Sequence, residues 1–180
     1  MSMYVTPSKN VMNRSRQVHI LCYDDRKSFS DEIKKMFVGN KRYDVISFHN
    51  KKMFVDYCKK SCSDEHINIG VIGFVESPEK IQLLNIFLDE ILNVLPKIKL
   101  LVFTQQKNIN EVSLEVAEKV DGVIPINNNM LLRTNNNIKR IISEHYLHLA
   151  AKKRNRIFIA TIAFLIFCII SIIMFYRLTR

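Results

Sequence analysis

The sequence VHILCYDD, residues Val18–Asp25, is a short apolar run that ends in two acidic residues. A solid Val/Ile/Leu-rich run of this length is typical of a strand buried on both faces of a parallel sheet. Four more runs of this kind follow along the chain: Val45–Phe48, Ile69–Phe74, Leu100–Phe103 and Val123–Ile126.

Helical patterns separate these runs. The strongest repeats apolar residues at helical spacing from Ile81 to Leu95 and stops at Pro96, and the last begins near Met130. Strand and helix in alternation predict a doubly wound α/β domain with a five-stranded parallel sheet. In such a sheet the functional site lies at the carboxyl ends of the strands. Weaker helical patterns are marked by Phe29, Ile33, Met36 and Phe37, by Met53–Cys58, and by Val112, Val116 and Val120.

Three strand-end motifs carry a family resemblance: the acidic pair Asp24-Asp25, the run Leu100–Thr104 that ends in a hydroxyl, and the turn Asp121–Pro125. In this order they resemble the receiver domain of bacterial two-component response regulators, over roughly Val18–Leu149. The resemblance implies a receiver (flavodoxin-like) fold. It also implies a phosphorylated aspartate after the third strand, Mg²⁺ held by the acidic pair, and a lysine after the fifth strand.

This sequence departs from the receiver pattern where the chemistry is done. The phospho-acceptor position falls on Gly73 and the lysine position on Ile126, whereas Thr104 keeps the hydroxyl. Two carboxylates without the third make a weak site for Mg²⁺, which needs several oxygen ligands. Asp24 and Asp25 therefore have two interpretations, a residual cation site or strand-end residues that cap the next helix. Phosphorylation in the usual manner is expected to be lost, and no metal or cofactor is expected beyond weakly bound Mg²⁺.

An unbroken apolar run of 20 residues, Ile157–Tyr176, stands near the end of the chain. About 20 apolar residues are enough to cross a bilayer as a helix, so the run predicts a transmembrane anchor. More basic residues precede the run than follow it, which predicts a single pass in the cytoplasmic membrane with the N-terminal domain in the cytosol. The cluster before the run is expected to meet the membrane surface: Lys152, Lys153, Arg154 and Arg156.

These observations predict five segments. A flexible basic arm (1–17) precedes a receiver-like domain (18–151), a basic juxtamembrane segment (152–156), a transmembrane helix (157–176) and a short tail (177–180).

The net charge of +10 does not indicate a nucleic-acid-binding protein. The two ends, 1–17 and 152–180, hold 9 of the 27 basic residues and no acidic ones, which leaves 18 basic against 17 acidic residues between them. The body therefore carries no charge excess to attract phosphates.

The leading hypothesis is a non-enzymatic, membrane-tethered pseudo-receiver that docks proteins. The expected partners are a histidine kinase, a membrane complex or a second copy. Two alternatives stay open. One is a receiver whose phosphorylation is displaced to Glu76, Asp24 or Asp25, and the other is a small membrane-bound α/β enzyme, although the 4 glycines form no phosphate-binding loop.

Overall fold

A computed structural model describes residues 17–24, 29–62, 66–73, 81–105, 110, 114, 116 and 118–178. The chain divides into two compact units, Met1–Ile141 and Ile142–Arg180.

The first unit is built on a five-stranded parallel sheet in the order β2-β1-β3-β4-β5. This architecture is the receiver, or flavodoxin-like, fold, so the predicted fold of this unit is confirmed. All five predicted runs become strands. Their bounds are β1 Val18–Tyr23, β2 Tyr43–Phe48, β3 Ile67–Gly73, β4 Lys99–Gln105 and β5 Gly122–Ile126. The three central ones, β1, β3 and β4, are buried along most of their length, whereas the edge strands β2 and β5 are less buried.

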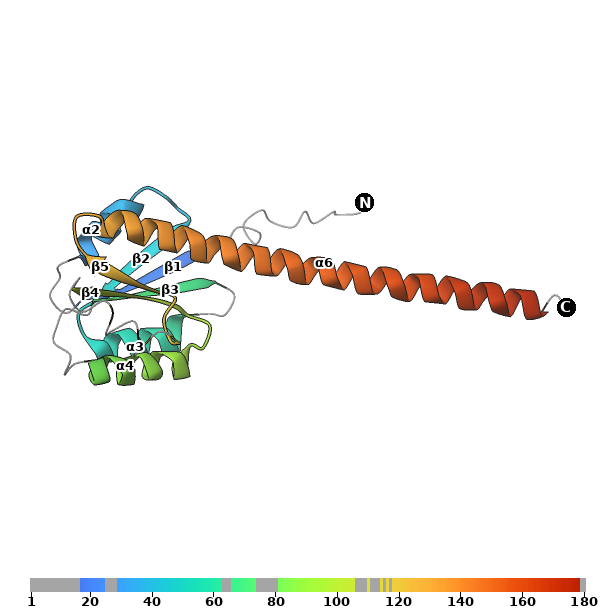
Figure 1. Ribbon diagram of the computed structural model, residues 1–180, viewed down its shortest axis with the longest axis horizontal. Coiled ribbons are helices and arrows are strands. Elements are labelled where there is room, and N and C mark those ends of the chain that lie inside the picture. Colours follow the sequence, from blue (N-terminus) through green and yellow to red (C-terminus); the bar gives the residue numbers. More distant parts are fainter. Residues whose placement is uncertain are drawn as a thin grey trace, which may run out of the picture. The chain divides into compact units, whose positions relative to one another are not determined.

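Helices cover both faces of the sheet (Figure 1). Helix α2 (Ser30–Phe37) and the first turns of α6 lie on one face, and α3 (Lys51–Ser61) and α4 (Ile81–Val94) lie on the other. Asn50 fixes the start of α3, because its side chain accepts the N–H groups of Lys52 and Met53. Each helix follows its strand, as right-handed crossovers in a parallel sheet require.

The core beneath α3 and α4 is aromatic. The ring of Phe54 in α3 makes edge contacts with Tyr23 of β1, Phe48 of β2 and Phe87 of α4. Phe54 is fully buried, and Leu88 of α4 is as well. One aromatic side chain thus joins two strands and two helices, which fixes α3 and α4 against the sheet.

Helix α6 (Met130–Leu178) contains the apolar run Ile157–Tyr176. Within the part of the chain that the structure describes, no helix combines the length and the apolar character needed to cross a bilayer. This finding contradicts the predicted single-pass localisation in the cytoplasmic membrane. The prediction counted consecutive apolar residues, but side chains at 163, 168–173, 175 and 176 lie outside the described ones, so the described residues supply no continuous span. The large apolar side chains described there, such as Phe158 and Phe164, are exposed.

Candidate functional site

The carboxyl ends of the central strands bring the predicted site residues to one edge of the sheet. Asp24 follows β1 and Gly73 ends β3, while the register sets Gly73 beside Phe103 and Thr104 beside Pro125. Ile126 ends β5. This edge is the place where the topology of the fold puts a functional site.

Asp24 is buried, and its carboxylate is engaged by the backbone. Its Oδ2 accepts the N–H of Phe29 at 2.8 Å and that of Ser30 at 3.2 Å, at the first residues of α2. Its backbone carbonyl oxygen lies 2.6 Å from Nδ1 of His49. A carboxylate at a helix N-terminus satisfies N–H groups that have no partner within the helix and is stabilised by the helix dipole. The geometry is therefore that of a helix cap. The second acidic residue, Asp25, lies outside the described residues.

Gly73 faces an aromatic ring where a receiver has its phospho-acceptor. A Cβ atom added at Gly73 would collide with Cε1 of Phe29 and lie 2.8 Å from its Cζ. The Phe29 ring is itself held in place, because it is buried and makes an edge contact with Phe103 at a centroid distance of 4.6 Å. A side chain at position 73 has no room unless Phe29 moves.

The remaining receiver-equivalent positions are Thr104 and Ile126. Neither side chain carries a positive charge. Thr104 is fully buried, and among the described residues its hydroxyl has no hydrogen-bond partner. Ile126 is 37% exposed at the end of β5, beside Gln105 of β4. An isoleucine here cannot neutralise the charge of a phosphoryl group.

The electrostatics of this edge do not create a nucleophile. Burial, and after it the negative charge of Asp24, raise the pKa of the Cys22 thiol to about 12. Cys22 therefore stays a neutral thiol, which is a poor nucleophile and a poor metal ligand. Within the described ranges, no three His, Cys, Asp or Glu side chains are grouped so as to hold a metal ion.

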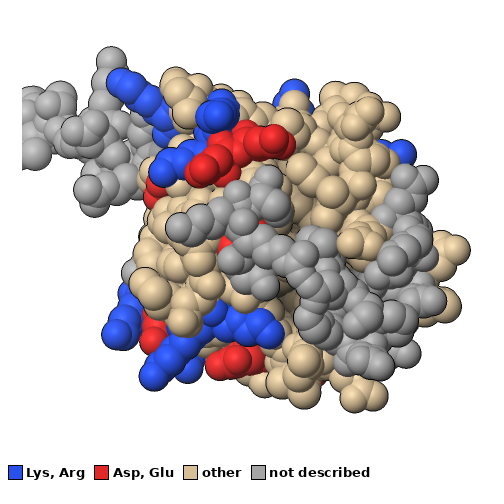
Figure 2. Space-filling model, turned by 90° about the vertical axis from the view of Figure 1, so that its left-hand side faces the viewer, with Lys and Arg blue, Asp and Glu red and all other residues tan. Residues whose placement is uncertain are grey.

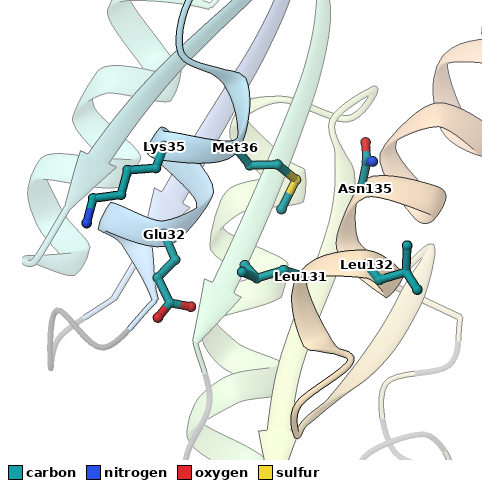
Figure 3. A pocket seen from close by; sticks show the side chains of 6 residues that line it. All are labelled: Glu32, Lys35, Met36, Leu131, Leu132 and Asn135. Carbon is teal, nitrogen blue, oxygen red and sulfur yellow. The ribbon is translucent and has the colours of Figure 1, made fainter.

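The surface around the site has mixed charge. Figure 2 shows basic and acidic side chains interspersed on this side of the molecule, with no single sign dominating the part that is described. A shallow groove of about 530 Å³ lies nearby between α2 and α6 (Figure 3), and none of the predicted site residues lines it. Its lining residues are Glu32, Lys35, Met36, Leu131, Leu132 and Asn135.

The basic cluster belongs to the second unit of the chain and is not part of this edge. Lys152 and Arg154 are exposed on α6, and the side chains of Lys153 and Arg156 lie outside the described ones.

Phe29 is the residue that sequence reasoning missed. It was assigned to the apolar face of a helix, which is correct as far as burial goes. A glycine at the end of a buried strand is the signal that could have been used, since glycine in a strand often marks a close approach of another group. The sequence does not say which group approaches.

Solved structures with this fold include response regulator receivers. A CheY-like receiver domain protein from Methanospirillum hungatei JF-1 has a TM-score of 0.57 and 16% identity, over 73% of this chain and 98% of the other. The pilus assembly protein CpaE from Caulobacter crescentus CB15 has a TM-score of 0.54 and 17% identity, over 68% and 98%. The isolated REC domain of RcsB from Salmonella enterica serovar Typhimurium has a TM-score of 0.52 and 13% identity, over 69% and 89%.

At these identities the similarity shows the fold alone, and that fold is the receiver fold. No protein-family model and no curated protein sequence matches the chain. Receiver domains are in general signalling and regulatory modules rather than enzymes.

Proposed function

We propose that residues 18–151 form a receiver-like domain that is not phosphorylated and that acts by binding other proteins. The observation that carries this proposal is the Phe29 ring, which fills the space in front of Gly73. A receiver needs a nucleophilic carboxylate in that space, and here the space holds an aromatic ring.

The other parts of the chemistry are missing or otherwise engaged. Phosphoryl transfer depends on metal ions and cations that neutralise the charge of the transferred group. Asp24 Oδ2 accepts the backbone N–H groups of Phe29 and Ser30 at the start of α2, and Ile126 stands at the lysine position. Three independent departures at one edge support the loss of phosphorylation.

A displaced phosphorylation site has little support in the described residues. Asp24 is 1% exposed, so a phosphodonor would have to enter the core to reach it. The other two candidates, Asp25 and Glu76, lie outside the described residues. For an enzyme of another kind, the one cysteine described at this edge, Cys22, is a neutral thiol and so a poor nucleophile.

A protein partner is the remaining role for such a domain. Receiver domains commonly interact with proteins such as kinases, through surfaces that do not themselves carry out chemistry. A histidine kinase and a second copy of this chain are the partner classes that the proposal admits. Because the switch is absent, binding is expected to be constitutive rather than controlled by a phosphoryl group.

Incubation of the full chain with acetyl phosphate and Mg²⁺, followed by intact mass measurement, tests the proposal. We expect no phosphoryl adduct. Beryllofluoride mimics a phosphoryl group on a carboxylate. Adding the chain to a beryllofluoride solution is expected to leave its fluorine NMR spectrum unchanged.

An acid-stable adduct on lysine would only report acetylation by the donor, so any added mass is located by peptide mapping. A phosphoryl group on Asp24, Asp25 or Glu76 that is lost on hydroxylamine treatment would overturn the proposal. The Asp24→Asn variant is the control that assigns the adduct to one of these residues.

A further inference from the structure

Helices α3 and α4 form one continuous layer on a face of the sheet (Figure 1). They contact each other through the rings of Phe54 and Phe87, whose centroids are 5.9 Å apart, and Nζ of Lys51 lies 5.2 Å from the centroid of Phe87. The outer side of this layer, here called the α3–α4 surface, faces away from the sheet and the strand-end site.

The two helices of the α3–α4 surface carry opposite charges. Helix α3 has four lysines and one half-buried acid, Asp56, whereas α4 has two acids and no basic residue. The exposed charges are Lys51, Lys52, Lys59 and Lys60 on α3, and Asp89 and Glu90 on α4.

Apolar side chains are also exposed here. Met53 on α3 is 64% exposed, and Leu83 and Ile86 on α4 are 54% and 64% exposed. Leu83 and Ile86 are three residues apart, so they lie on the same side of α4. Apolar groups flanked by charges are the composition of a protein-binding surface.

The contacts between the helices fix which residues lie at the same level. Phe54 and Lys51, in the first turn of α3, meet Phe87, in the second turn of α4. Met53 is therefore level with Ile86. Long side chains on a helix tilt toward its N-terminus, so Lys59 and Lys60 reach back toward the level of Glu90.

We propose that the α3–α4 surface binds the same surface of a second copy of this chain, about a two-fold axis parallel to the two helices. That axis places α3 of each copy over α4 of the other, in the same direction. Met53 then packs against Ile86, and the lysines at the end of α3 meet the acids of α4. Each contact occurs twice, because a two-fold interface is self-complementary.

The second copy follows from the way the charges are divided. A basic strip and an acidic strip that lie side by side become complementary to the same surface of a second copy when that surface is turned over onto it. Asp89 already binds Lys119 at 2.7 Å, so Glu90 is the acid expected to contribute most. The inference rests on the proposed function, since it names one partner of the docking domain.

Two charge-reversed variants of the full chain test the proposal. Lys59→Glu with Lys60→Glu makes the C-terminal end of α3 acidic, like α4, while Lys51 and Lys52 stay basic, and Asp89→Lys with Glu90→Lys makes both strips basic. Each variant is prepared with two different tags, and the fraction of one tagged form that copurifies with the other is measured at low salt. The matched control is Lys34→Glu with Lys35→Glu, the same change in charge at exposed positions of α2.

We expect each reversed variant to lose self-association by about tenfold or more, because several like charges then face each other twice. The control variant should associate as the unmodified chain does. A mixture of the two reversed variants should recover association, since the acidic surface then meets the basic one. Added salt should weaken the recovered complex.

The proposal is overturned if the unmodified chain does not self-associate. It is also overturned if the unmodified chain self-associates and either reversed variant does so to the same extent. It is also overturned if the mixture fails to recover, because the charges would then serve a different partner. The phosphoryl assay on the same chains keeps the outcomes apart. A phosphoryl adduct in that assay would contradict the proposed function. If no adduct forms and the chain does not self-associate, only the proposal of a second copy as partner is contradicted.

Discussion

The two ends of the parallel sheet are built differently. At the carboxyl ends of the strands, Phe29 fills the space at Gly73 and the Asp24 carboxylate caps a helix. At the amino ends, the rings of His19 and His66 stack 4.8 Å apart, and Lys99 forms an ion pair with Asp121 at 2.7 Å. The polar groups thus interact with one another at the end where a receiver has no active site.

The two edges of the sheet therefore differ in what their side chains do. The carboxyl edge is packed like a core, with an aromatic ring against a glycine and backbone groups satisfied by a buried acid. The amino edge holds His19, whose pKa is lowered by burial. Substitutions at the first edge should therefore change packing, and substitutions at the second should change the response to pH.

The largest effects are expected at the contact between Phe29 and Gly73. Phe29→Ala removes a buried ring and should lower the free energy of unfolding by about 3–5 kcal/mol. Gly73→Ala forces a methyl group against that ring and should cost about 1–3 kcal/mol. Both changes in the free energy of unfolding can be measured by urea unfolding of the full chain, followed by circular dichroism.

The double variant sharpens this prediction. With Phe29→Ala present, the methyl group of Gly73→Ala enters vacated space, so the two costs should not add, and the coupling should be about 1 kcal/mol or more. Additive costs would show that the ring does not fill the space at Gly73. In that case the argument against a phospho-acceptor would lose its main support.

A smaller effect is expected at Asp24. Asp24→Ala leaves the N–H groups of Phe29 and Ser30 without their acceptor and should lower the free energy of unfolding by about 1–2 kcal/mol. Asp24→Asn keeps an oxygen in the same place and should cost about half as much or less. Amide exchange at Phe29 and Ser30, measured by NMR, should quicken only in the alanine variant. Equal costs for the two variants would favour a role for the charge itself, such as cation binding.

The smallest effect is expected at the amino edge and depends on pH. Burial, then the neighbouring His66, lower the pKa of His19 below 6.5, against the opposing pull of Asp44. The unfolded chain then binds a proton more readily than the folded one, so stability should fall as the pH drops through 6.5. His19→Gln should flatten this dependence between about pH 8 and about pH 5.5 in urea unfolding.

The control for this prediction is His148→Gln, a substitution at an exposed position of α6. It should leave the dependence on pH as in the unmodified chain. A His19→Gln variant with an unchanged dependence would contradict the lowered pKa of His19 in the folded chain.

The strands were predictable because each one contains a short apolar run, and the three central strands are buried along most of their length. Val18–Tyr23 was predicted with its observed bounds, and the run from Leu100 to Phe103 extends only to Lys99 and Gln105 in β4. The long helix after β5 begins at Met130, as its apolar spacing indicated. These features depend on local pattern, which a sequence displays directly.

The closure of the site was not predictable in the same way. Gly73 was identified as the position without a nucleophile, but the pairing of Phe29 with that glycine joins residues 44 positions apart, through the sheet register and a buried ring. The localisation was predicted wrongly, because an apolar run of 20 residues was taken as sufficient for a membrane span. The predictions for Thr104, Ile126 and the basic cluster Lys152–Arg156 stay predictions.

The ring of Phe29 also sets an order for mutational change at this edge. A carboxylate side chain introduced at position 73 while Phe29 is present would collide with the Phe29 ring. The free energy of unfolding would then fall, whether or not the new carboxylate was reactive. Shrinking Phe29 first opens the space but leaves a cavity. Whichever of positions 29 and 73 is changed first, the stepwise introduction of a carboxylate at this edge is therefore expected to pass through a less stable chain.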